Sequence, residues 1–405
     1  MADQEFELSD DDNLPLDQQE DIDDIETTDR WFHGATLWST DWTTETLLAQ
    51  LNRGNINLNP SYQRRSSWRP DRKSRFIESL ILGLPIPQII LAEDKNKRGS
   101  FIVIDGKQRL LTLRQYCSEE GDKFDSLKLV GLEERQDLNS TNFSDLRSRA
   151  EFADDLIAFE NQTIRTVVIR NWKNERYLYS VFLRINTGSL PLSPQELRQA
   201  LQPGDFSTFV DTFSMNSKEL QKALSLKAPD FRMRDAELVL RYFAYINFFQ
   251  EYDGRFKEFL DLTSKRLNQR WEADRHLIEK QAKDLELALA TVREIFGERG
   301  ALRKWNGSEY ERRVNRAVFD IMVYYFKDVE IRKKALKEKE AIEEAFRTLC
   351  EEDIEFLYSI ERTTKSLDSN QIRFDAWGQA LSAVCGVPVP RFTIQSSPRR
   401  ILITG

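Results

Sequence analysis

Histidine and cysteine are scarce in this sequence. The 405 residues include two histidines, His33 and His276, and three widely spaced cysteines. So few histidines leave almost no material for a Ser-His-Asp triad or a histidine-ligated metal site, so we expect no metal and two ordinary surface histidines. The thiols of Cys117, Cys350 and Cys385 are expected to be reduced, because an odd and sparse set of cysteines does not suit a disulfide framework.

Long apolar runs are also missing. No stretch of eighteen apolar residues occurs, so the sequence predicts no transmembrane helix. The acidic N-terminus has no charged-then-apolar leader, so we expect no signal peptide. These features favour a cytoplasmic protein. With 40% apolar residues among 405, the chain has enough material for two or three ordinary domains.

Basic residues are absent from the first part of the chain. Residues 1–29 contain thirteen aspartates and glutamates and no lysine or arginine. The whole chain carries 59 bases and 67 acids, a net charge of −8, so removing this segment leaves 54 acids and a net charge of +5. Such composition predicts an acidic disordered tail over residues 1–30. The tail either solubilises the chain or covers a basic groove until nucleic acid displaces it.

Hydrophobic patterns change at about residue 205. Before it, strands are predicted over 88–92, 101–104 and 163–170, and helices over 45–51, 70–82, 108–116 and 175–185. After it, strand signals nearly vanish, and helices are predicted over 234–249, 256–267, 271–296, 308–326, 332–350 and 371–385. We therefore predict an α+β fold, with a small mixed sheet and its helices in residues 31–204, a mainly α-helical domain in residues 205–390 and a tail over residues 391–405. The last ten residues of this tail are expected to be loose or strand-like.

The most informative motif is a short apolar strand that runs directly into Asp105-Gly106-Lys107-Gln108-Arg109. A helix that begins at such a turn directs unpaired backbone amides toward an anion, above all phosphate. Lys107 and Arg109 add positive charge, and Gly106 permits a close approach or a positive φ. Asp105 is available to a magnesium-bound water, a ribose hydroxyl or Arg109. The alternative is a plain strand-to-helix turn whose charges are solvated.

A second motif lies upstream of this loop. Six basic residues and one acid lie between residues 64 and 75, with Tyr62 and Trp68 beside them. Basic and aromatic side chains together suit contacts to DNA phosphates and bases. The residues predicted to contact DNA are Arg65, Arg69, Arg72 and Lys73. The alternative is that the aromatic rings anchor a loop to the core while the arginines stay solvated.

A third motif, residues 182–188, leads into a strong helix start at Ser193. Ser193 can cap this helix, Pro194 suits its first turn, and Glu196 can bond back to the cap. Asn186 either ends the preceding helix or belongs to a polar lid over the phosphate loop.

These motifs together resemble the N-terminal domain of GmrSD-type restriction endonucleases. Their common order and spacing carry the resemblance, which covers roughly residues 40–260. The matching segments are Tyr62-Gln63-Arg64 with Trp68, 73–79, 83–87, 105–110, 182–187 and 192–198. The resemblance implies a fold similar to ParB and sulfiredoxin, with a nucleotide phosphate at the turn after residue 104.

The resemblance also implies residue roles. The family's loop is usually Asp-Gly-Gln-Gln-Arg, so Lys107 stands where a glutamine is common, and nucleotide binding carries over better than hydrolysis. The implied nucleotide-binding residues are Gly106, Lys107, Gln108 and Arg109, with Gln63, Arg64 and Arg75 flanking the loop and Asn186 facing it. Asp105 and Arg109 are the implied catalytic pair. The implied cofactor is a nucleoside triphosphate, with or without Mg²⁺.

Three functions stay open. Family members are associated with nucleoside-triphosphate hydrolysis that licenses or regulates cleavage of modified or foreign DNA. The first function is therefore a nucleotide-binding protein of a restriction or phage-defence system, with hydrolysis left open. The second is a non-catalytic ParB-like DNA-binding or adaptor protein, and the third is nuclease action by the loop itself. The C-terminal His-Asn-His nuclease motif of many family members is not visible. Expected partners are a nucleotide, DNA, and a partner nuclease or second copy of the chain, but no membrane.

Overall fold

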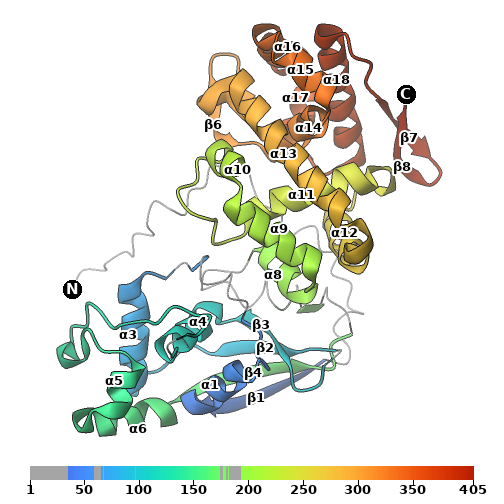
Figure 1. Cartoon of the computed structure of the whole chain (residues 1–405). Helices are drawn as coiled ribbons and strands as arrows, with labels where there is room; N and C mark the ends of the chain where they lie inside the picture. Colours follow the sequence, from blue (N-terminus) through green and yellow to red (C-terminus); the bar gives the residue numbers. More distant parts are fainter. Residues whose placement is uncertain are drawn as a thin grey trace, which may run out of the picture. The chain divides into compact units, whose positions relative to one another are not determined.

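The computed structural model describes residues 35–58, 65–66, 68–95, 97–119, 121–173, 177–178, 181 and 193–405. The described residues form two compact units (Figure 1). The first, the sheet unit, contains residues up to 201 together with 231–233. The second, the helical unit, contains residues 202–230 and 234–405. The predicted α+β class is confirmed, because a small mixed sheet is followed by a mainly helical region.

Four strands form the sheet of the sheet unit. They are β1 (Thr36–Thr43), β2 (Ile89–Glu93), β3 (Phe101–Asp105) and β4 (Thr163–Arg170), in the order β1-β4-β2-β3. β2 runs parallel to β4, whereas the other two pairs are antiparallel, so the sheet is mixed. Strand β1 is an edge strand, and eight residue pairs join it to β4.

Each face of this sheet is covered by helices, because alternate residues of a strand point to opposite faces. Ile89 and Leu91 belong to one buried cluster, whereas Ile90 and Ala92 belong to another. The first cluster also holds apolar residues of α1 (Thr44–Asn52), α3 (Pro70–Ile81), α4 (Lys107–Tyr116), α5 (Phe143–Ser148) and α6 (Ala153–Asn161). The second holds Leu197 of α8 (Pro194–Leu201). Helices α4 and α8 therefore cover opposite faces of the sheet.

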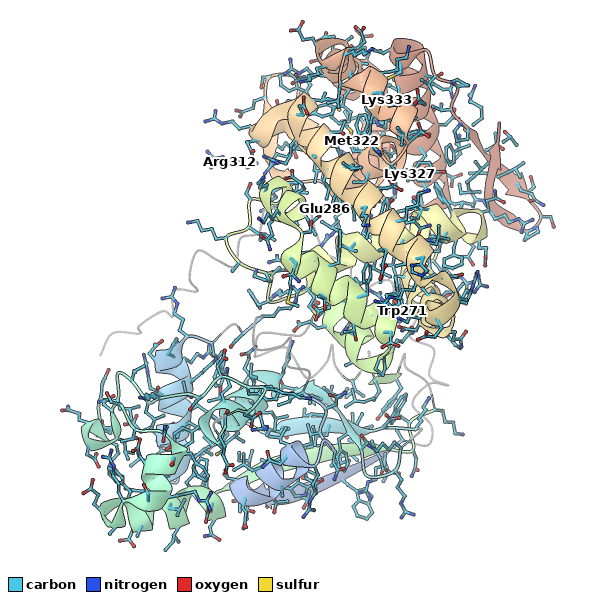
Figure 2. All side chains as sticks on the ribbon, viewed as in Figure 1. Trp271, Glu286, Arg312, Met322, Lys327 and Lys333 are labelled. Atoms are coloured by element: carbon cyan, nitrogen blue, oxygen red, sulfur yellow. The ribbon has the colours of Figure 1, made fainter. Side chains whose placement is uncertain are left out.

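The helical unit is built around α14 (Arg316–Phe326), every residue of which is buried. Met322 of this helix lies among the side chains of the unit (Figure 2). The other helices are α9 (Asp205–Asn216), α10 (Lys218–Ala223), α11 (Arg234–Phe248), α12 (Phe256–Gln269), α13 (Trp271–Gly300), α15 (Val329–Ala335), α16 (Lys339–Glu352), α17 (Ile354–Glu361) and α18 (Leu367–Cys385). Two hairpins complete it, β5 (Arg303–Trp305) with β6 (Tyr310–Val314), and β7 (Arg391–Ser396) with β8 (Arg399–Thr404).

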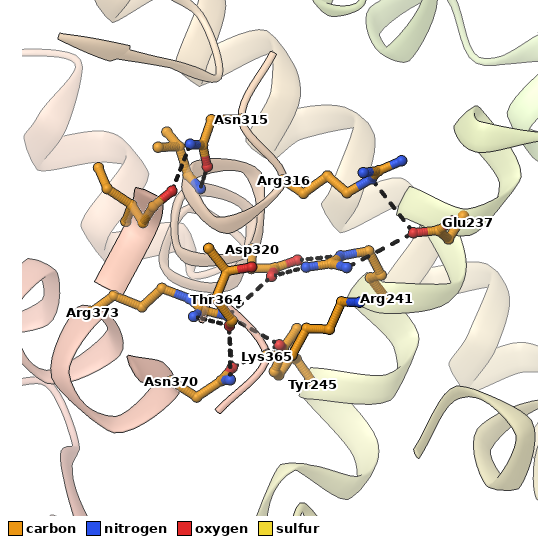
Figure 3. Close-up of polar contacts among 12 residues, drawn as sticks. Glu237, Arg241, Tyr245, Asn315, Arg316, Asp320, Thr364, Lys365, Asn370 and Arg373 are labelled. Atoms are coloured by element: carbon orange, nitrogen blue, oxygen red, sulfur yellow. Dashed lines mark hydrogen bonds and ion pairs between the residues drawn. The ribbon is translucent and has the colours of Figure 1, made fainter. Parts of the chain in front are cut away.

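A buried polar network joins three helices of this unit (Figure 3). Asp320 of α14 accepts hydrogen bonds from the Nε (2.9 Å) and Nη2 (2.5 Å) atoms of Arg241 on α11. Arg373 of α18, whose side chain is fully buried, lies 3.4 Å from the same carboxylate and donates to Asn370 at 2.7 Å. Asp320 thus contacts two guanidinium groups in the core, and Glu237 lies 3.8 Å from Arg241 as a second buried carboxylate, where an unpaired charge would be costly.

The region after residue 205 is mainly helical, as predicted, and it also contains four short strands, β5, β6, β7 and β8. The helix predicted over residues 308–326 begins only at Arg316, since Tyr310–Val314 before it pair as β6 with β5. The helix predicted over residues 332–350 is two helices, α15 and α16. Within residues 391–405, the strand-like alternative for the C-terminal tail is the one observed, because β7 and β8 pair there as a hairpin. The predicted domain boundaries and the acidic tail stay predictions, and residues 1–34 lie outside the described part.

No helix within the described residues is long and apolar enough to cross a membrane. All three cysteine thiols are free, as expected. Burial raises the pKa of the Cys350 thiol to about 12, so this thiol is protonated at neutral pH.

Candidate functional site

The turn between β3 and α4 requires a glycine for two reasons. Gly106 precedes the first residue of α4 and has φ +95°, a left-handed conformation that L side chains rarely adopt. A Cβ atom at this position would lie 3.0 Å from Cγ1 of Ile89, which is closer than ordinary packing allows. The positive φ predicted for this glycine is confirmed. The crowding comes from Ile89, and the close approach of an anion to Gly106 stays a prediction.

The N-terminus of α4 has no side-chain cap. Gly106 offers no hydrogen-bonding side chain, and its carbonyl accepts a hydrogen bond from the Leu110 amide at 2.9 Å, one helical turn later. The amides of Lys107, Gln108 and Arg109 precede that bond, so they are donors at the positive end of the helix dipole. Such an end favours an anion, and phosphate binds there in many unrelated proteins.

Asp105 holds the arginine of the loop in place. Its Oδ2 atom lies 2.8 Å from Nη2 of Arg109, one helical turn later, and both side chains are largely buried. Of the three roles anticipated for Asp105, the structure contains the one in which it orients Arg109. The pair sits where the register of β2 and β3 shifts between Ile90 and Leu91, so the end of β3 departs from regular pairing.

Lys107 has a partner that the sequence does not suggest. Its Nζ atom donates to Oε1 of Glu196 at 2.7 Å, and each side chain is only 7% exposed. Glu196 belongs to the first turn of α8, where it also completes the predicted cap. Its Oε2 atom accepts from the Ser193 amide at 2.8 Å, and the Ser193 hydroxyl accepts from the Glu196 amide at 3.0 Å. The predicted capping box is confirmed, but its glutamate has a second bond to the 105–109 loop.

The basic segment upstream contacts the same loop. The hydroxyl of Ser66 donates to Oε1 of Gln108 at 3.0 Å, which brings this segment to the start of α4. Trp68 packs against Phe76 with ring centroids 5.7 Å apart and against the first buried cluster. Trp68 therefore anchors the segment, as one of the two interpretations of this motif expected.

The basic residues of this segment separate into buried and exposed sets. Arg65 is 1% exposed and Lys73 is 8% exposed, so two of the four predicted DNA contacts lie in the interior. Lys73 donates to Oε1 of Gln115 on α4 at 2.8 Å, and burial lowers the pKa of its ammonium group. Arg69 and Arg72 are exposed, and the guanidinium of Arg72 lies 4.8 Å from the Trp68 ring centroid.

Arg75, predicted to flank the nucleotide, is also exposed. Its Nη2 atom lies 3.2 Å from Oδ2 of Asp71, an ion pair on the outer side of α3. Gln63, Arg64 and Asn186, the other predicted flanking residues, lie outside the described residues, as does His33. The described part of the site therefore consists of the 105–109 loop, Glu196 and the segment around Ser66 that contacts Gln108.

Metal-ligating groups do not gather in the described part of the chain. No three side chains of histidine, cysteine, aspartate or glutamate lie close enough there to hold an ion together. His276 is fully exposed on α13 and lies 4.0 Å from Glu279, which fits the ordinary surface histidine that was expected.

The fold and the site together define a mixed α+β domain. Strand β3 of its sheet leads through Gly106 into α4, which has no side-chain cap and carries two cationic side chains, Lys107 and Arg109, in its first turn. Residues 45–202 match the family described as GmrSD restriction endonuclease, N-terminal domain. This part of the chain is therefore similar to that domain, and the match ends where the helical unit begins. The match indicates a protein of a restriction type of system. Comparisons with curated proteins and with solved structures found no match.

Proposed function

We propose that the chain is a nucleotide-binding regulatory protein of a DNA-restriction or phage-defence system, working in the cytoplasm. The observation that carries this proposal is the left-handed, uncapped start of α4 at Gly106, with Arg109 held beside it by Asp105 at 2.8 Å. The helix amides supply donors to phosphate oxygens, and a guanidinium group binds phosphate with two parallel hydrogen bonds.

Each loop residue then has a defined part. Gly106 provides the left-handed turn and fits against Ile89, where a side chain would be crowded, and the amides that follow it face the phosphate. Lys107 and Arg109 offset the negative charge of the phosphates, and Gln108 connects the loop to Ser66. Asp105 positions Arg109 and is the carboxylate that a phosphate-bound Mg²⁺ would meet, where the ion would supply additional positive charge. Gln63, Arg64, Arg75 and Asn186 are proposed to complete the nucleotide site.

The experiment is an equilibrium titration of the full chain with ATP and GTP, with phosphate release measured in parallel. Because a charge-assisted hydrogen bond contributes about 1.5–3 kcal/mol, Arg109→Ala should weaken nucleotide binding by about tenfold or more. Asp105→Ala should weaken it as well, since Arg109 then loses its orientation. The matched control is Arg149→Ala, which removes another arginine from an i,i+4 pair, with Asp145 at 3.0 Å on the surface of the same unit. The control should bind nucleotide as the unmodified chain does.

A second function is favoured by a separate observation, the exposed Arg69 and Arg72 beside the anchored Trp68. It is a ParB-like DNA-binding adaptor without catalysis, whose arginines contact DNA phosphates. Repeating the titration with and without duplex DNA separates the two. Nucleotide binding without phosphate release in every DNA condition would exclude hydrolysis and leave a non-catalytic adaptor. Unchanged binding by Arg109→Ala would show that the nucleotide site lies elsewhere.

A further inference from the structure

The ion pair between Lys107 and Glu196 joins helices on opposite faces of the sheet. Lys107 is the first residue of α4 and Glu196 lies in the first turn of α8, 89 residues later in the chain. The two side chains are 7% exposed and their charged atoms are 2.7 Å apart. A pair this buried is not an accidental surface contact, because removing either partner would leave a charge in the protein interior.

Glu196 cannot easily turn away from Lys107. One carboxylate oxygen accepts from the lysine and the other from the Ser193 amide, so both oxygens are committed. The Ser193 hydroxyl in turn accepts from the Glu196 amide. This reciprocal cap fixes the backbone and side chain of Glu196 together. The carboxylate is therefore a rigid anion placed at the phosphate loop.

The side-chain charges of the loop balance within the protein. Arg109 is matched by Asp105 at 2.8 Å and Lys107 by Glu196 at 2.7 Å. A phosphate that arrives at the amides of α4 meets two cations that already bind carboxylates. Lys107 strengthens the binding of this phosphate only to the extent that the phosphate displaces Glu196, since both anions bind the same ammonium group.

We propose that Glu196 is an affinity-determining residue of this site, an internal competitor of phosphate for Lys107. The proposal rests on the proposed function. Glu196 lowers the affinity of the loop for phosphate chains and transmits their binding to the first turn of α8. The ligand class is a polyphosphate, such as the phosphate chain of a nucleotide, because such a chain can reach both the Lys107 and the Arg109 side of the helix N-terminus.

The variant that tests this is Glu196→Gln, which has the same size, keeps one acceptor oxygen and loses the charge. With inorganic tripolyphosphate as the probe, and EDTA present, calorimetric titration should show binding about tenfold tighter than that of the unmodified chain. The gain should shrink as salt rises, because it is electrostatic. The double variant Lys107→Gln/Glu196→Gln should bind no more tightly than the unmodified chain, since the gain acts through Lys107.

Ser193→Ala is the matched control, because it removes the hydroxyl of the cap and leaves the Lys107–Glu196 pair intact. It should not tighten tripolyphosphate binding. A gain in Ser193→Ala equal to that in Glu196→Gln would overturn the proposal, since loosening of α8 would then explain both. Circular dichroism and thermal unfolding verify that each variant is folded.

A measurement on the unmodified chain keeps the test independent of any variant. Tripolyphosphate should change the hydrogen exchange of the first turn of α8, residues 194–197, because Glu196 loses its lysine when phosphate takes it. Two outcomes would contradict the competition but leave the phosphate site in place. In the first, tripolyphosphate binds and the hydrogen exchange of residues 194–197 is unchanged. In the second, folded Glu196→Gln binds tripolyphosphate as tightly as the unmodified chain does, or more weakly. If neither the unmodified chain nor Glu196→Gln binds any polyphosphate, the proposed function itself fails.

Discussion

Single residues decide whether the 105–109 loop has its shape. Gly106 combines φ +95° with a Cβ position 3.0 Å from Ile89, whereas Gly54 has φ +69° and nothing within 4 Å of its Cβ position. A comparison of the two glycines therefore separates the free-energy cost of the left-handed backbone from the cost of a crowded Cβ atom. This comparison is useful because both glycines lie in the same unit and next to a helix end.

Gly106→Ala should destabilise the chain by about 2–3 kcal/mol, the sum of left-handed strain and a packing clash. Gly54→Ala should cost only about 1 kcal/mol, because strain acts there alone. Urea denaturation followed by circular dichroism measures both. Equal losses in the two variants would mean that the backbone at Gly106 has room for a side chain.

The sequence predicts only those parts of the site that depend on residues close together in the chain. Five consecutive residues specify the turn and the helix start, so Gly106 and the Ser193–Glu196 cap could be derived in advance. The bond from Lys107 to Glu196 could not, because nothing in the sequence says which acid among many meets a lysine 89 residues away. The burial of Arg65 and Lys73 was missed for a related reason, since charged residues are ordinarily exposed.

At the scale of elements, helices with clear apolar periodicity and strands buried on both faces were predictable. Strand β4 has the predicted bounds, and α4 differs from its prediction by one residue. Strand β1 was missed because it is an exposed edge strand, with Leu37 61% and Trp38 56% exposed, so it shows no alternation of apolar and polar residues. Regular geometry in α13 stops at Gly297, which has φ +66°, just after the predicted end at residue 296.

The polar network among α11, α14 and α18 gives a prediction at this scale. Asp320→Asn preserves side-chain volume but removes the carboxylate beside Arg373 and leaves Arg241 with Glu237 alone, at 3.8 Å, so unfolding free energy should fall by about 3–5 kcal/mol. Asp368→Asn is the control, because its partner Arg399 lies 2.7 Å away in an ion pair that is more than half exposed. That substitution should cost about 1 kcal/mol or less. Thermal unfolding of the two variants provides the comparison, and similar losses would show that the network adds no stability beyond a surface pair.

At the scale of the whole molecule, charge is divided along the chain. The first 29 residues carry thirteen acids and no base, and the remainder is positive by five charges. Exposed Arg69 and Arg72 belong to that positive remainder. The predicted cover of basic side chains by this polyanion would lower the affinity for DNA, because DNA would have to displace the acidic segment.

Deleting residues 1–29 should therefore tighten binding to duplex DNA at low salt, and the gain should fade as ionic strength rises. Fluorescence anisotropy at several salt concentrations measures this, with thermal unfolding as the control for fold. Equal affinity of the full and shortened chains at every salt concentration would assign the acidic segment a solubilising role alone.

The pairing of β1 with β4 also dictates the order of events during synthesis. In the described sheet the neighbour of β1 is β4, whose last residue, Arg170, lies more than a hundred positions after Thr43. Translation at roughly 5–20 residues per second delays that pairing by on the order of ten seconds after β1 leaves the ribosome. Until then, Leu37 and Trp38 belong to a nascent segment without its strand partner. The sheet unit therefore closes late, by a long-range contact that is intrinsically slow to form.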